Sequence, residues 1–343
     1  MKSFLTPKVF VGTAISILAL WLAVRDVPFG ELGNALQGAS YVWLIPAVAL
    51  HFLSIGARAQ RWVVLLGKQG SLADSFWAQS IGYLFTNILP LRAGEPARVI
   101  AMAERCRLPI LQVAASAVVE RLLDLATILL ILLLVLPWMQ VPMLVIQAGQ
   151  SFGAVMLVAL VALLLAVRLS GRGERILQSV CNHVTLLPRE SILARWRQTV
   201  DGLAPLKHFN VAVWSVGWSS LAWASSLAIN WSVLRVFEAD ASLVEAAFMQ
   251  VALALAVTIP SSPGFIGVFQ LAGQQALVLP FGAKYTAANA LAITMVAHMT
   301  YYLLTSALGV AGLWKLGSSL ARVGRVVKSE LSSGSSASKK VAW

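Results

Sequence analysis

The segment NILPLRAGEPARV, residues 87–99, decides the fold because it interrupts an apolar stretch with residues that a spanning helix excludes. It contains two prolines, a glycine, two arginines and a glutamate. Proline ends the hydrogen-bond ladder of a helix, and charged side chains are costly inside a bilayer. The segment therefore predicts two half-helices whose polar groups are satisfied by protein or by a water-filled cavity.

The composition around this segment predicts an all-α integral membrane protein. Of 343 residues, 59% are hydrophobic and 12% are charged, and the mean hydropathy is +0.80. That leaves too little polar surface for a water-soluble globule of this size. Apolar runs of about 20 residues suit helical spans, and no alternating pattern of a β-barrel is present. The predicted spans lie at about residues 9–24, 42–57, 111–136, 144–168, 209–234 and 286–314.

Two further apolar segments are short and are each broken by prolines and glycines. We predict re-entrant helical hairpins at about residues 75–107 and 243–280, the second around IPSSPGFIGVFQ at residues 259–270. An odd number of spans separates them, so they enter from opposite faces, as in an inverted repeat. The expected fold has about six transmembrane helices and two oppositely oriented hairpins.

The charge pattern predicts the orientation of the chain. The net charge is +12, and the basic residues lie in loops between apolar runs rather than along one amphipathic face. This is the positive-inside pattern of a membrane protein rather than a nucleic-acid surface. Residues 1–320 form one predicted membrane domain with a basic cytoplasmic loop at 169–208, and residues 321–343 form a disordered basic tail. Both termini are expected in the cytoplasm, in a bacterial inner membrane.

A basic and aromatic segment follows the second predicted span. The sequence ARAQRWVVLLGK, residues 57–68, contains Arg58, Arg61, Trp62 and Lys68. It predicts a short interfacial helix with its charges at the membrane surface. A loop that satisfies the positive-inside rule explains the same charges equally well.

No metal, cofactor or structural disulfide is expected. The two cysteines, Cys106 and Cys181, form no C-x-x-C pair, and the four histidines lack the spacing of metal ligands.

The two hairpins predict an anion site near the middle of the membrane. Helix N-termini direct unpaired N–H groups and a partial positive charge toward the break. Arginines add full charges, and a lipid phosphate is the obvious anion in a bilayer. The predicted substrate-binding residues are Arg92, Gly94, Glu95, Arg98, Arg121, Pro263, Gly264 and Gly267.

A charged triad occurs in the middle of the span at residues 111–136. Glu120, Arg121 and Asp124 fall within little more than one helical turn, and a triad at this depth must face the protein interior. One interpretation is a structural ion cluster that fixes this helix to its neighbours. The other gives Arg121 a role as a phosphate or counter-ion ligand, with Glu120, Asp124 or Glu95 as a proton carrier.

Four stretches together resemble a known family. They are RAQRWVVLL (58–66), NILPLRAGEPAR (87–98), VVERLLDL (118–125) and IPSSPGFIGVFQ (259–270). In this order they are similar to the transmembrane domain of lysylphosphatidylglycerol synthases, the flippase-like domain family. The resemblance implies a membrane domain that moves lipids with modified or sugar-bearing head groups. A stand-alone member without the aminoacyl-transferase domain is expected.

The favoured hypothesis is a flippase, not an enzyme, that moves a phosphate-bearing lipid between leaflets. That lipid is anionic, aminoacylated, glycosylated or polyprenyl-linked. Two alternatives remain open. One is a membrane-embedded enzyme that uses Glu95, Glu120 or Asp124 as acid or base on a lipid head group. The other is a membrane partner that docks a lipid-modifying enzyme on its cytoplasmic basic loop.

Overall fold

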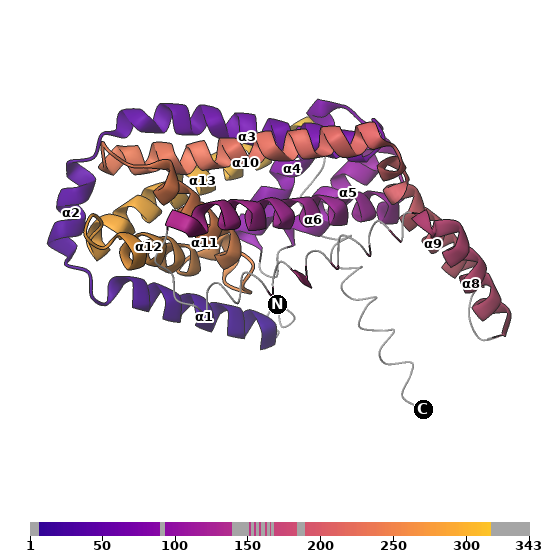
Figure 1. Ribbon diagram of the computed structural model, residues 1–343, viewed down its shortest axis with the longest axis horizontal. Helices are drawn as coiled ribbons and strands as arrows, with labels where there is room; N and C mark the ends of the chain where they lie inside the picture. The colour runs from indigo at the N-terminus through magenta and orange to yellow at the C-terminus, as the bar shows by residue number, and fades with distance from the viewer. Residues whose placement is uncertain are drawn as a thin grey trace.

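Helices are the only regular secondary structure in the described part of the chain. The computed structural model describes residues 7–89, 93–138, 168–183 and 189–316, with isolated helical positions between 151 and 165. No strand occurs in these residues, which confirms the all-α class (Figure 1). Arg92, most of the predicted span at 144–168 and the predicted tail at 321–343 lie outside the described residues.

The helices are α1 (Pro7–Val24), α2 (Phe29–Gln37), η1 (Tyr41–Trp43), α3 (Leu44–Leu65), α4 (Leu72–Ile88), α5 (Gly94–Cys106), α6 (Ile110–Val135), η2 (Leu136–Trp138), α8 (Ser170–His183), α9 (Arg189–Leu203), η3 (Ala204–Lys207), α10 (Phe209–Phe237), α11 (Leu243–Ala256), η4 (Pro263–Phe265), α12 (Val268–Phe281) and α13 (Ala287–Lys315).

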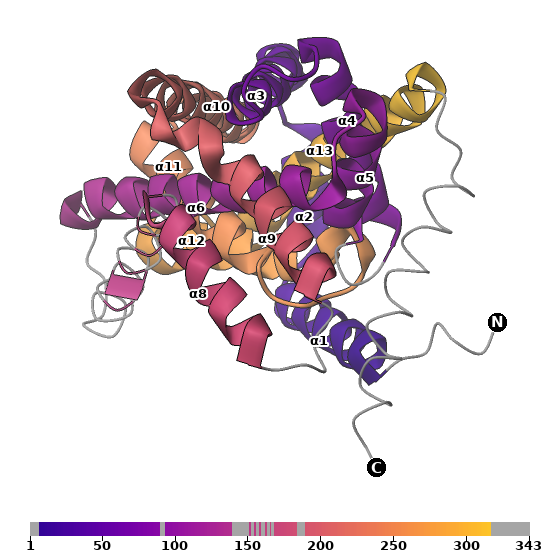
Figure 2. The ribbon, with the colours of Figure 1, turned by 90° about the vertical axis from the view of Figure 1, so that its right-hand side faces the viewer.

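Helices α3 and α10 form a long antiparallel pair along one side of the bundle (Figures 1 and 2). At one end, the rings of Trp43 and Trp231 meet edge to face with centroids 5.6 Å apart. Further along, the Ser54 hydroxyl donates a hydrogen bond to the Ala222 carbonyl over 3.2 Å. Small residues in the contact allow the two backbones to approach closely.

The predicted interruption at residues 90–94 separates α4 from α5, and the two helices pack against each other. They are antiparallel, because Gly94 lies on Thr86 while Arg105 pairs with Asp74 at the other end. A Cβ added at Gly94 would lie 2.0 Å from the Gly82 carbonyl oxygen. Glycine is therefore required here for contact between two helix backbones.

The second interruption separates α11 from α12 and contains η4. Gly264 and Gly267 adopt positive φ angles of 68° and 88°. A Cβ added at Gly264 would lie 3.4 Å from the carbonyl oxygen of Asn87, which is close to the end of α4. The two interruptions thus lie beside each other, although they are far apart in the sequence.

The packing order is repeated in the two halves of the chain. Helix α3 packs on α4 as α10 packs on α11, and α5 packs on α6 as α12 packs on α13. Helix α6 also contacts α11, as α13 contacts α4. Since α3 and α10 run antiparallel, this is the arrangement that an inverted repeat produces. That the two broken pairs are re-entrant in a bilayer stays a prediction.

Three helices in the described part are long and apolar enough to cross a membrane. They are Tyr41–Leu65, Pro263–Phe281 and Ala287–Lys315. A fourth candidate is the pair Phe10–Val24 and Phe29–Gln37, bent by 83°. Helix α6 has 26 residues but carries three charged residues near its middle. The predicted number of spans stays a prediction.

The predicted interfacial helix at residues 57–68 is wrong. Helix α3 continues to Leu65, and Arg61 and Trp62 are among its most deeply buried side chains. The charge of Arg61 is tolerated there because carboxylates of α6 face it.

The predicted basic loop at 169–208 contains two helices, α8 and α9, which extend beyond one end of the bundle (Figure 1). They are joined by an ion pair of 2.8 Å between Arg197 and Glu174. Helix α9 packs on the start of α6, where a Cβ at Gly202 would lie 2.2 Å from the Gln112 carbonyl. This segment is therefore anchored to the membrane domain.

The fold predicts that the end of α5 and the turn after α10 lie on opposite sides of the membrane. Cysteines introduced by Glu104→Cys and Ala239→Cys, after Cys106 and Cys181 are replaced by serine, should react with an impermeant maleimide from opposite sides. Both positions are exposed, and they lie at opposite ends of the bundle. Labelling of both from the same side of oriented vesicles would contradict this topology.

The contact between α4 and α5 can be tested by adding one methyl group. Gly94→Ala should lower the free energy of unfolding by about 1–3 kcal/mol, because the methyl group would overlap the Gly82 carbonyl. Unfolding in mixed micelles measures the change. Gly30→Ala in α2 is the matched control, since nothing lies within 4 Å of its added Cβ. Equal stability of the two variants would contradict the close helix contact.

Candidate functional site

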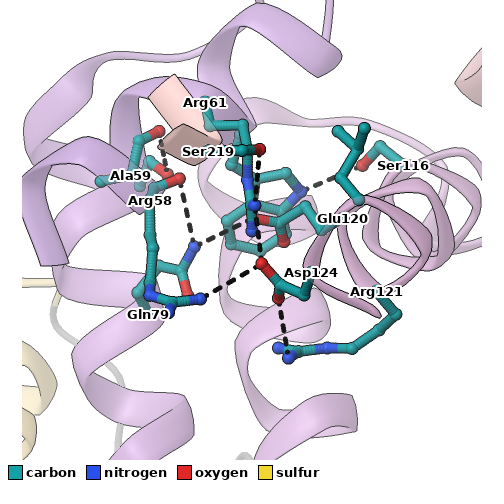
Figure 3. A network of polar contacts seen from close by, with 12 residues as sticks. Arg58, Ala59, Arg61, Gln79, Ser116, Glu120, Arg121, Asp124 and Ser219 are labelled. Atoms are coloured by element: carbon teal, nitrogen blue, oxygen red, sulfur yellow. Dashed lines mark hydrogen bonds and ion pairs between the residues drawn. The ribbon is translucent and has the colours of Figure 1, made fainter. Parts of the chain in front are cut away.

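Seven charged side chains from α3, α5 and α6 converge inside the bundle. Figure 3 shows Arg58, Arg61 and Arg121 directed toward Asp124. Helix α3 provides two arginines, α5 an arginine and a glutamate, and α6 two carboxylates and an arginine. We call this set the charged cluster: Arg58, Arg61, Glu95, Arg98, Glu120, Arg121 and Asp124.

The inner part of the charged cluster is buried. Glu120 accepts from Nη2 of Arg61 at 3.1 Å and from Nη1 of Arg98 at 2.6 Å. Nη1 of Arg61 also donates to Oδ1 of Asp124 at 2.7 Å. The Arg61 side chain is 1% exposed. Buried charges must be paired, because removal of one partner leaves an uncompensated charge. These contacts fix α3, α5 and α6 to one another.

The outer part of the charged cluster is open. The side chains of Arg121 and Glu95 are 48% and 43% exposed and form an ion pair of 2.7 Å. Arg121 also reaches Asp124 at 3.2 Å, and Arg58 reaches the same carboxylate at 3.3 Å. Exposed ion pairs contribute little to stability. This side of the cluster is therefore able to exchange partners.

Neutral side chains support the charged cluster. Gln79 of α4 donates to Glu120 at 3.4 Å and accepts from Arg98 at 3.2 Å. The indole N–H of Trp223 on α10 donates to Asp124 at 3.0 Å. The guanidinium of Arg98 lies over the ring of Trp62 at 4.7 Å, an arrangement in which the ring face attracts the cation.

The charged cluster lies near the middle of helix α6. Glu120 and Asp124 are near the middle of α6, which has 26 residues. At about 1.5 Å per residue, Glu120 is about 15 Å from the first residue of the helix. In a helix that spans the bilayer, as the sequence predicts for α6, this distance is half of a hydrocarbon core about 30 Å thick. Helix α5 begins beside the cluster, with Glu95 in its first turn, where a carboxylate is favoured by the helix dipole.

The charged cluster carries more positive than negative charge. Four arginines face three carboxylates, so these described residues sum to one positive charge. Within the described part, Nε of Arg61 and Nη2 of Arg98 are buried without a hydrogen-bond partner. An uncompensated positive charge deep in a bundle favours binding of an anion.

The structure brings together most of the site residues predicted in the first half. Glu95, Arg98, Glu120, Arg121 and Asp124 are all in the charged cluster. Arg61, rather than Arg121, lies between the two carboxylates of α6, and Arg121 is on the open side.

Arg58 and Arg61 were predicted at the membrane surface, and their place in the charged cluster was not predicted. The sequence does carry a signal for a longer helix. The two arginines are three residues apart, and no proline separates them from the apolar run before them, so the helix can continue past the end of that run. Arg92 lies outside the described residues.

The predicted site residues of the second half have other contacts. The Gly264 carbonyl is hydrogen-bonded to Nε2 of His298 at 2.8 Å. A Cβ added at Gly267 would lie 2.2 Å from the Ser16 carbonyl in α1. Pro263 begins η4, which contacts α4. Binding roles for Gly94, Pro263, Gly264 and Gly267 stay predictions.

The described residues contain no group of three histidine, cysteine, aspartate or glutamate side chains that could hold a metal ion. Both cysteines are free.

The comparisons with known proteins agree with this membrane architecture. Residues 9–309 match the family model described as the lysylphosphatidylglycerol synthase TM region. The chain belongs to this family. A "UPF0104 membrane protein" of Methanothermobacter thermautotrophicus is 25% identical over 331 residues, which cover 89% of this chain and 95% of that protein. No solved structure matches the chain. The resemblance predicted from the four stretches is confirmed, and the chain is a multi-pass membrane protein.

In this family member, Glu120 is expected to be the main structural residue of the charged cluster. Glu120→Ala should lower the free energy of unfolding in micelles by about 3–5 kcal/mol, because it leaves Arg61 and Arg98 buried with fewer partners. Arg105→Ala, which breaks an ion pair with Asp74 at the bundle surface, is the control and should change it little. Similar losses in both variants would contradict this role.

Proposed function

We propose that the protein is a lipid transporter that moves a phosphate-bearing lipid between the two leaflets. The head-group phosphate binds at the open side of the charged cluster, between Arg121 and Arg58. The observation that carries the proposal is the excess positive charge of the cluster near the middle of α6. A phosphodiester supplies one negative charge and neutralises it.

The chemistry of the open side suits a phosphate. Guanidinium groups bind phosphate oxygens through two parallel hydrogen bonds. Arg121 is half exposed and is held by Glu95, itself half exposed, so a phosphate can displace this carboxylate. The released Glu95 is then placed to accept a hydrogen bond from an ammonium or hydroxyl group of the same head group. Aminoacylated and sugar-bearing phospholipids carry such groups.

Head-group binding would alter the contact between α5 and α6. Glu95 at the start of α5 bridges to Arg121 of α6 and to Arg98 of its own helix, at 2.7 Å and 2.9 Å. Displacement of Glu95 from Arg121 removes one of these bridges, whereas the buried pair of Arg98 with Glu120 remains. The repeated packing of the two halves suits alternating access, in which one broken pair moves against the other.

The segment α8–α9 supports a second candidate function, the docking of a lipid-modifying enzyme. Both helices extend beyond the bundle (Figure 1). Helix α8 exposes the apolar residues Ile176 and Val180 beside the basic residues Arg172 and Arg175. Transport by the purified protein alone favours the first function. Lipid movement that requires a co-purified enzyme favours the second.

The proposed location is a bacterial inner membrane with the end that bears α8 and α9 in the cytoplasm. Basic residues gather at this end, whereas the opposite end carries several carboxylates. Positive loops are retained on the cytoplasmic side. The basic residues concerned include Lys68, Arg105, Arg107, Arg172, Arg175, Arg195 and Arg197.

Removal of the open-side charge should stop lipid movement without unfolding the protein. Arg121→Gln is expected to slow the transfer of fluorescent phosphatidylglycerol about tenfold or more, because a charged hydrogen bond to phosphate is lost. Bleaching of outer-leaflet fluorophore in proteoliposomes measures the rate. Arg121→Lys should retain part of the activity, and Arg105→Gln should retain all of it.

Normal transport by a folded Arg121→Gln variant would contradict the proposed phosphate site. If Arg121→Gln transports at the normal rate while remaining monodisperse, the charged cluster is structural and the phosphate site is wrong. If the variant unfolds, Arg58→Gln on the same open side provides the second test, since Arg58 contributes one long ion pair of 3.3 Å.

A further inference from the structure

A cavity of ≈ 940 Å³ lies at the end of the bundle that bears α8 and α9, apart from the charged cluster. Its walls come from the end of α3, the turn after it, the start of α6, the segment around η3 and the start of α10. Ligand pockets in proteins have volumes of about 300–1,000 Å³. The cavity is large enough for the head group of a phospholipid.

One wall of this cavity carries two opposite charges. Lys68 and Asp201 both line it. Within the described part of the chain, neither forms an ion pair with the other or with another side chain. Both are exposed. The remaining polar lining consists of amides and an imidazole from Gln60, Gln69, Gln112, His208 and Asn210. A ligand with one positive and one negative group would satisfy this wall.

The other wall of the cavity is aromatic. Trp214 and Trp218 are one turn apart on α10 and line the cavity with Val211. Trp214 is 61% exposed. Tryptophan is enriched where lipid head groups meet the hydrocarbon core, and these residues lie within the first turns of a long apolar helix. From the aromatic wall we expect the cavity to open toward the bilayer at head-group level.

The cavity is separate from the charged cluster. Gln60 and Trp218 line it, while their neighbours Arg61 and Ser219 hydrogen-bond to each other at 3.0 Å inside the contact of α3 with α10. None of the described residues that line the cavity belongs to the charged cluster. A ligand in the cavity therefore does not depend on the proposed transport function.

We propose that this cavity binds the head group of a zwitterionic aminophospholipid from the adjacent leaflet. The phosphate pairs with Lys68 and receives a hydrogen bond from His208. The primary ammonium group pairs with Asp201 and donates to the amides of Gln60 and Gln112. The acyl chains leave past Trp214 and Trp218. A choline head group is excluded from these donor contacts because it has no N–H, and a glycerol head group leaves Asp201 without a cation.

The test is lipid binding to the full chain in detergent, measured by native mass spectrometry. Phosphatidylethanolamine should bind with about tenfold higher affinity than phosphatidylglycerol or phosphatidylcholine with the same chains. The double variant Lys68→Gln/Asp201→Asn should lose this preference at unchanged net charge. The matched control Lys315→Gln/Glu104→Gln alters one charge of each sign at the same end, outside the cavity, and should retain it.

Several outcomes would overturn the proposal. The protein could bind the three lipids with equal affinity, or it could prefer phosphatidylglycerol. Both double variants could lose the preference for phosphatidylethanolamine to the same extent. Inorganic phosphate alone could displace the lipid. If the cavity variant does not fold, Asn210→Trp fills the cavity from an exposed position and should block the same binding. Arg121→Gln must leave the lipid preference intact, so failure of the transport proposal is distinguishable from failure of this one.

Discussion

The structure depends on one carboxylate that pairs with two buried arginines. Glu120 of α6 accepts from Arg61 of α3 and Arg98 of α5, and all three side chains are almost completely buried. An unpaired charge is unfavourable in the interior of a bundle, so the positions of α3, α5 and α6 depend on one another. Trp223 of α10 and Gln79 of α4 extend the same constraint to two more helices. The α5 half-helix is held in the bundle by this pairing.

The two halves of the chain share the order in which their helices pack, but the charged cluster belongs to the first half. In the second half, an ion pair of 3.2 Å between Glu245 of α11 and Lys284 lies at the end of the bundle, whereas two buried contacts between its helices are neutral. Gln270 pairs with His298 at 2.8 Å, and Asn230 with Gln250. Neutral hydrogen bonds fix these helices without a net charge. The charged cluster is thus confined to the first half, and its rigid interior and open side lie within one network. In the proposed transport, the open side changes partners while Glu120 keeps the helices together.

Much of the fold could be predicted because it depends on local patterns. Apolar length predicted the all-α membrane class, and the prolines and glycines at 90–94 and 260–267 predicted the breaks between α4 and α5 and between α11 and α12. The triad spacing placed Glu120 and Asp124 on an interior face. The assignment of Arg58 and Arg61 failed, because a basic run after an apolar run is the same in sequence whether its partners are lipid phosphates or carboxylates of another helix. Helix α2 and the helices α8 and α9 also escaped prediction.

Composition and break points follow from the sequence alone, since the free-energy cost of a charge or a proline in a lipid-spanning helix is set by the residue itself. Which arginine is buried and which is open was decided by tertiary structure. Arg61 and Arg121 are both next to apolar residues in the sequence, but only Arg61 meets two carboxylates when α3 packs on α6. The same holds for the cavity at the basic end, because Lys68, Gln112 and Trp214 line one cavity only after α3, α6 and α10 have packed together.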